Sequence, residues 1–228
     1  MIQTTIKANK EQRQKMLNVL LKFGSREKSK AIIKCLQEIE GLYLSALVHL
    51  SKAYVLYQPT SVKYFKNNKA THFWSITASS LYDSGVMYVC GLLDKDKKIN
   101  YKNLRKLISN VDQLKKKPGN TPILSKSIEP VYERLKAHRD TQLAHYEYSK
   151  GATHNWEDSI ISMNLIHKYI VDFHVAFFDT DFILEKLREE TADESFRVCG
   201  TIGILEIEKD VKEEVINFFE KVEAKIKW

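Results

Sequence analysis

The chain has 228 residues, a net charge of +7 and 43% hydrophobic residues, which is enough for a packed core. Glycine (8) and proline (4) are scarce, so helix is favoured over sheet. There is no run of about 18 apolar residues and no apolar signal-peptide core at the polar N-terminus, so we expect a cytoplasmic protein that does not enter a membrane. The three cysteines, Cys35, Cys90 and Cys199, are far apart and predict neither a disulfide framework nor a metal-ligand pair.

Charge is divided unevenly along the chain. Residues 1–150 hold 27 Lys or Arg and 12 Asp or Glu, a balance of +15, whereas residues 151–228 hold 9 and 17, a balance of −8. Basic surface attracts phosphate backbones, so a bound polyanion is expected on the first two-thirds of the fold. The alternative is an ordinary solvated surface, or a basic half that complements an acidic half.

The first two predicted helices are amphipathic. Residues 9–23 form a short helix that Gly24 ends. Ser25 caps a second, long helix that runs to about Tyr57 and stops before Pro59. The wide apolar stripe of the second helix is typical of a helix buried in a bundle.

A third helix is predicted from about Thr71 to Leu93. Asp83 lies within it among mostly uncharged neighbours, and we interpret it as a residue of the solvated face, with a functional role as the alternative. Several small residues should let another helix approach closely: Ala78, Ser79, Ser80, Ser84 and Gly85.

The middle of the chain is basic and irregular. Asn100 can cap a short helix over residues 101–114. The following KKKPGN segment contains a Pro-Gly breaker and predicts a surface loop. Its lysines, Lys115, Lys116 and Lys117, are candidates for phosphate contacts, although lysine runs are more often simply solvated.

The next predicted helix, which begins at Thr121 or Ser125 and ends near Tyr148, changes character along one face. Its stripe begins with three apolar residues, Ile128, Val131 and Leu135, and then continues with polar ones, His138, Gln142 and His145. Buried polar groups are unfavourable unless they are paired. The change therefore indicates a cleft, an interface or a site.

Two more helices complete the pattern. Thr153, His154 or Asn155 starts one that runs from Trp156 to about Arg188, and residues 210–227 form the last. His167 and His174 lie seven residues apart in the former, without the ligand pattern of a metal site, and we interpret them as packing histidines.

The predicted fold class is therefore all-α, a helical bundle with a C-terminal helical appendage. We divide it into an N-terminal helix (1–24), a bundle (25–195) and the appendage (196–228).

One stretch, LKAHRDTQLAHYEY, carries a recognisable motif. Arg139 and His145 enclose five residues, and Asp140 directly follows the arginine. Arg-x5-His late in a helical bundle resembles the signature of the HEPN superfamily. The Arg-Asp pair, Leu-Ala-His and the tyrosines that follow, together with the earlier LLDKDKKINYKNLRKLI, resemble its abortive-infection branch, the Abi type U-like proteins of phage defence. The resemblance covers roughly residues 30–190.

The resemblance implies a HEPN-type bundle and metal-independent RNA cleavage by a homodimer whose motifs meet at one cleft. RNA supplies its own nucleophile, the 2′-hydroxyl. Histidine can transfer protons near neutral pH, and arginine can hold phosphate oxygens in a two-pronged grip. His145 is thus the candidate general acid or base, Arg139 the phosphate ligand and Asp140 the orienting carboxylate, and neither a metal nor a cofactor is expected.

Helix geometry complicates this assignment. At about 100° per residue, Arg139 and His145 point about 120° apart, so a paired helix from a second protomer would help to form the site. His138 shares a face with His145 and is a candidate accessory acid or base. Tyr146 and Tyr148 could stack on a base, although tyrosines at a helix end more often pack on a neighbouring helix.

Two rival hypotheses remain open. The bundle could bind RNA, a nucleotide or a protein without cleavage, with an affinity that falls steeply with salt. It could also be half of a two-protein system, with a cognate antitoxin or a nucleotidyltransferase as its partner.

Overall fold

The structure is a computed structural model. It describes residues 10–22, 24–58, 61–62, 71–94, 104, 107, 129–145, 155–178, 188–193 and 208–224. Within these ranges, the side chains of residues 10–13, 71, 141–145, 176–178 and 208–210 lie outside the description.

The described part of the chain is helical and contains no strand, which confirms the all-α prediction. In chain order the helices are α1 (Lys10–Leu21), α2 (Arg26–Leu56), α4 (Thr71–Leu93), α6 (Glu129–His145), α7 (Trp156–Phe178) and α9 (Glu208–Glu223). Each predicted helix from the first to the third is present, with its ends within about three residues of those expected. Of the predicted short helix at 101–114 only Leu104 and Leu107 are described, and both are buried.

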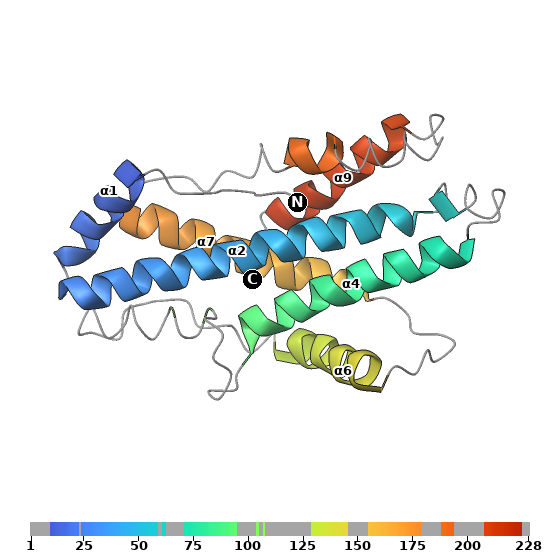
Figure 1. Cartoon of the computed structure of the whole chain (residues 1–228), viewed down its shortest axis with the longest axis horizontal. Helices are drawn as coiled ribbons and strands as arrows, with labels where there is room; N and C mark the ends of the chain where they lie inside the picture. Colours follow the sequence, from blue (N-terminus) through green and yellow to red (C-terminus); the bar gives the residue numbers. More distant parts are fainter. Residues whose placement is uncertain are drawn as a thin grey trace.

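Helices α2 and α4 make the most extensive contact between two described helices and form the centre of the molecule. They lie side by side and run in opposite directions (Figure 1). The Ser25 hydroxyl accepts a hydrogen bond from the Lys28 N–H at 3.4 Å, as expected of an N-cap. Along α2 the buried positions recur at helical spacing, so one broad face lies in the core.

A glycine sets the close approach of these two helices. A Cβ atom added at Gly85 would lie 2.5 Å from Cγ of Leu50 on α2, whereas one added at Gly41 would meet nothing within 4 Å. The prediction that small residues of the third helix permit close packing is therefore confirmed at Gly85.

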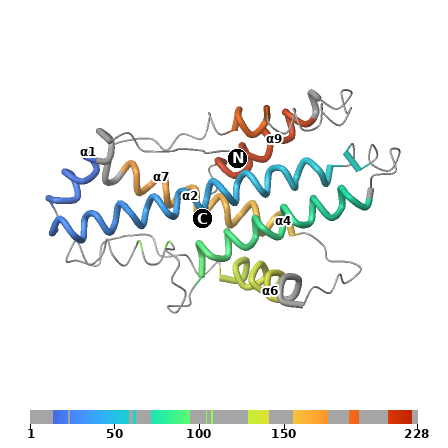
Figure 2. Tube along the Cα trace, viewed as in Figure 1, coloured from blue at the N-terminus to red at the C-terminus, as the bar shows by residue number. Residues whose placement is uncertain are grey.

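The remaining helices cover α2 and α4 from different sides. Helix α9 packs on α2 and α7, while α6 packs on α4 and α7 (Figure 2). Asn164 of α7 closes the end of α9, because its side-chain amide donates to the Val222 and Ala224 carbonyls at 2.6 Å each. Helix α1 packs on α2 and α7, and the division into three domains stays a prediction.

No helix in the described ranges combines the length and the apolar character that crossing a bilayer requires.

Substitution of the two glycines tests the packing of α2 against α4. Gly85→Ala should lower the free energy of unfolding by about 1–3 kcal/mol, because the new methyl group overlaps Leu50. Gly41→Ala, the matched control in open space, should raise it by about 0.5–1 kcal/mol, because alanine loses less backbone entropy on folding. Urea denaturation measures both, and equal effects of the two substitutions would contradict the packing described.

Candidate functional site

Helix α6 is held by apolar and by polar contacts. Its described buried apolar residues, Val131, Tyr132 and Leu135, lie in its first two turns. Ion pairs and hydrogen bonds made by Arg134, His138 and Arg139 add to this packing.

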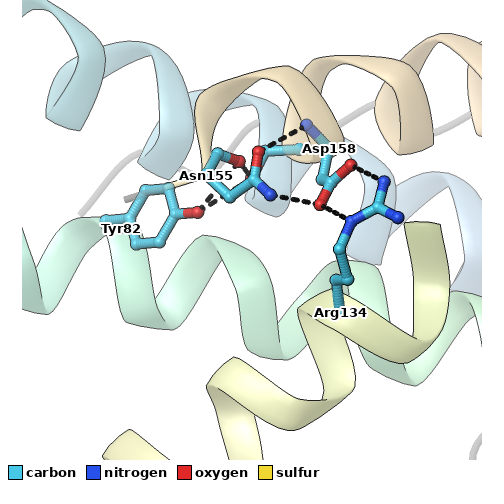
Figure 3. A network of polar contacts seen from close by, with 5 residues as sticks. Tyr82, Arg134, Asn155 and Asp158 are labelled. Atoms are coloured by element: carbon cyan, nitrogen blue, oxygen red, sulfur yellow. Dashed lines mark hydrogen bonds and ion pairs between the residues drawn. The ribbon is translucent and has the colours of Figure 1, made fainter. Parts of the chain in front are cut away.

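The strongest of these contacts joins α6 to the start of α7. The Arg134 guanidinium donates through Nε to Asp158 Oδ2 at 2.7 Å and through Nη2 to Asp158 Oδ1 at 2.5 Å (Figure 3). The Asp158 side chain is only 3% exposed, whereas that of Arg134 is 55% exposed. A buried carboxylate needs a cation, and the two-pronged geometry of arginine matches it.

The same network reaches α4 through the N-cap of α7. Asn155 accepts the Asp158 N–H through Oδ1 at 3.1 Å, and its side-chain amide donates to the Asp158 carboxylate. Tyr82 of α4 donates to the Asn155 carbonyl at 3.1 Å and lies 3.2 Å from the Ser159 hydroxyl (Figure 3). Burial raises the pKa of Tyr82 to about 12, so its hydroxyl stays protonated at neutral pH. Three helices therefore meet at this point.

His138 lies one turn further along α6 and pairs with α4. Its Nε2 is 3.2 Å from Asp83 Oδ1, and its ring stands edge-on to the Tyr82 ring at 5.3 Å between centroids. The side chains of His138 and Asp83 are 13% and 26% exposed. The interpretation of Asp83 as simply solvated is therefore wrong, because α6 covers that part of α4 and supplies a histidine to it.

Arg139 is held by two carboxylates. Its Nε and Nη2 both lie 2.8 Å from Asp140 Oδ1, and its Nη1 lies 3.6 Å from Asp94 Oδ2. Burial lowers the pKa of Arg139, but the hydrogen bond to Asp140 and nearby negative groups more than offset this, so the net shift is upward. The guanidinium thus remains charged.

Asp94 follows the last residue of α4, and its side chain is 5% exposed. Tyr132 and Cys90 lie close to it. Burial, together with the negative charge of Asp94, raises the pKa of Tyr132 well above its usual range. Burial also raises the pKa of Cys90 to about 12, so this thiol is not a nucleophile at neutral pH.

The structure thus brings His138, Arg139 and Asp140 onto α6 beside the acidic residues of α4. His145 is the last residue of α6, so the helix that carries Arg139 continues unbroken to it. The His145 side chain lies outside the described part, as do Tyr146, Tyr148, Lys115, Lys116 and Lys117. Their assigned roles remain predictions.

Sequence reasoning missed three residues that hold the site: Asp94, Arg134 and Asp158. Asp158 had a detectable signal, since Asn155 and Asp158 have the spacing of a helix N-terminal cap. Asp94 ends the helix in the LLDKDKKINYKNLRKLI stretch that carries the family resemblance, but nothing local predicts its contact with Arg139. Arg134 offered no signal, because its partner lies on another helix.

The histidines of α7 face α2, away from this network. His167 Nδ1 lies 3.0 Å from the Tyr43 hydroxyl, and His174 Nε2 lies 2.6 Å from Glu40 Oε1. Their interpretation as packing histidines is confirmed by these contacts. Among the described residues, no group of three or more His, Cys, Asp or Glu is arranged to hold a metal ion.

Comparison with known families decides the membership of the chain. The family model of AbiU2, in the HEPN superfamily, matches residues 31–195. The chain belongs to the AbiU2 family, the abortive-infection branch of HEPN proteins. This confirms the resemblance seen in the sequence, and the matched range includes α6 with its whole Arg-x5-His motif. No curated protein and no solved structure matches the chain.

The half-buried His167 of this AbiU2 protein should make stability fall with acid. Burial lowers its pKa to about 4, below the ordinary value of about 6.5 in the unfolded chain. The unfolded state therefore binds the proton first, and stability is lost as the pH falls from about 6.5 towards 4. His167→Asn should reduce the loss between pH 7 and pH 5 by about 1–2 kcal/mol.

Urea titrations at the two pH values measure this difference. His72→Asn, at an exposed position of α4, is the matched control and should leave the loss unchanged. An equal loss in the wild type and in His167→Asn would contradict the assignment.

Proposed function

We propose that the protein is a metal-independent endoribonuclease that acts as a homodimer in phage defence or in a toxin–antitoxin system. The observation that supports this most directly is the setting of Arg139. A charged arginine, held by carboxylates from two helices, lies six residues before His145 on one continuous helix of an AbiU2 protein.

Each step of RNA cleavage has a candidate residue in this arrangement. His145 removes the proton of the 2′-hydroxyl or protonates the leaving 5′-oxygen. Arg139 binds the phosphate and stabilises the charge that develops on its oxygens. The products are a 2′,3′-cyclic phosphate and a 5′-hydroxyl.

His138 is the candidate accessory acid or base. Its contact with Asp83 orients the imidazole. Tyr146 and Tyr148 would stack on bases, and Lys115, Lys116 and Lys117 would contact the backbone of the bound strand.

A second candidate function is RNA, nucleotide or protein binding without cleavage, alone or with an antitoxin or nucleotidyltransferase partner. The observation that favours it is the pairing of Arg139 with two carboxylates, which is also the arrangement of a purely structural ion pair.

Substitution of His145 separates the two functions. Wild-type protein, incubated with transfer RNA and a mixed RNA pool in EDTA, should give fragments with 2′,3′-cyclic phosphate ends. His145→Ala should lower the cleavage rate at least about 100-fold, because the general acid or base is lost. Gel electrophoresis of end-labelled RNA measures the rate.

His72→Ala, which removes an exposed histidine of α4, is the matched control and should cleave as the wild type does. Cleavage that survives in His145→Ala would refute the assignment of this residue. If wild-type protein binds RNA but does not cut it, the binding function takes the place of the nuclease.

A further inference from the structure

We propose that Asp94 and Asp140 have opposite roles at Arg139: Asp94 anchors the guanidinium, and Asp140 covers the edge to which an RNA phosphate binds. The phosphate would therefore displace Asp140 and leave Asp94 in place. This rests on the proposed function, in which Arg139 is the phosphate ligand, and adds to it a fixed carboxylate and an exchangeable one.

The two carboxylates contact different atoms of the guanidinium. Asp140 Oδ1 lies 2.8 Å from both Nε and Nη2, the edge whose two parallel N–H groups fit two oxygens of one phosphate. Asp94 Oδ2 lies 3.6 Å from Nη1, at the far corner. Asp140 thus occupies the place that a two-pronged phosphate contact needs, and Asp94 does not.

Asp94 and Asp140 also differ in burial, and this difference assigns them the same two roles. The Asp94 side chain is 5% exposed, so water cannot readily take the place of Arg139 beside it. The Asp140 side chain is 55% exposed, so water can solvate it once it leaves Arg139. Ion pairs as exposed as this one are weak, which makes Asp140 the exchangeable partner.

The exchange requires little movement of the chain. Asp140 is the neighbour of Arg139 on α6, and neighbouring side chains do not naturally face each other on a helix. Rotation of the Asp140 side chain into solvent is therefore enough to open the Nε–Nη2 edge. The backbone of α6 and the contact with Asp94 stay as they are, so the arginine meets the phosphate in a single orientation.

Two matched substitutions test these opposite roles. Asp94→Asn and Asp140→Asn each remove one negative charge beside the same arginine. The probe is a fluorescent 2′-O-methyl RNA oligonucleotide of mixed sequence, which cannot be cleaved because its 2′-hydroxyls are blocked. Affinity is measured by fluorescence anisotropy at low salt, where charge effects are largest.

The two variants should change affinity in opposite directions. Asp140→Asn should bind about two- to fivefold tighter, because a competing anion is removed. Asp94→Asn should bind about tenfold weaker, because the guanidinium loses its anchor. Asp94→Glu, which keeps the charge but shifts it by one methylene, should weaken binding less than Asp94→Asn does. When Arg139 is also replaced by Ala, the two Asn substitutions should no longer change the affinity in opposite directions.

Three results would overturn the proposal. Tighter binding by both Asn variants would mean that only the overall charge matters. Opposite signs that persist without Arg139 would mean that the two residues act elsewhere. A wild-type protein that does not bind the probe would leave Arg139 without the anion on which the roles depend.

Folding and cleavage are measured separately, so that each failure can be recognised. Circular dichroism and urea midpoints show whether every variant folds. If Asp94→Asn does not fold, Asp94→Glu and Asp140→Asn still test the proposal. It is overturned if Asp94→Glu binds the probe more tightly than the wild type does, or if Asp140→Asn binds it more weakly. Opposite shifts in a protein that does not cut RNA would refute the nuclease and leave the two roles established.

Discussion

Two buried carboxylates fix the place of helix α6, and the rest of the candidate site depends on that. Asp94 stands at the end of α4 and Asp158 in the first turn of α7, with side chains 5% and 3% exposed. A charge so far from water is tolerated only when it is paired and hydrogen-bonded. Both cations come from α6, as Arg139 and Arg134. The two ion pairs therefore help to set the rotation of α6 about its axis, together with the buried side chains of Val131, Tyr132 and Leu135.

Because ion pairs help to hold α6 in place, the helix can carry polar side chains at the candidate site. Its described buried apolar residues are Val131, Tyr132 and Leu135, and the motif occupies the turns beyond them. Apolar packing is not directional, whereas an arginine–carboxylate contact fixes both distance and orientation. Anchors at Arg134 and Arg139 can thus hold the helix without covering it with apolar side chains. The hydrogen bond from the Tyr82 hydroxyl to the Asn155 carbonyl connects α4 to the same contact between α6 and α7.

The sequence predicted the helices well and their polar contacts poorly. Ser25 was recognisable as a cap and the apolar stripes as helices, because these signals are local. Asp83 pairs with His138, which lies 55 positions further along the chain. Arg134 pairs with Asp158, which lies 24 positions further along. No local pattern encodes such a pair, so Asp83 was assigned to solvent. The Arg-x5-His motif was visible because its members lie on one helix, whereas the carboxylates that surround Arg139 depend on how α4 and α6 pack.

The contact of Arg139 with Asp94 also bears on the proposed homodimer. Asp94 holds the guanidinium towards the end of α4, and the helical position of His145 is turned about 120° from that of Arg139. In-line attack on a phosphate requires the proton-transfer group and the phosphate ligand to converge on one atom. A flexible arginine could swing round α6 to meet its own histidine, but that movement would break the contact between Arg139 and Asp94. An anchored Arg139 is therefore better served by the His145 of a partner protomer than by its own, which connects the fixed carboxylate of α4 to the proposed homodimer.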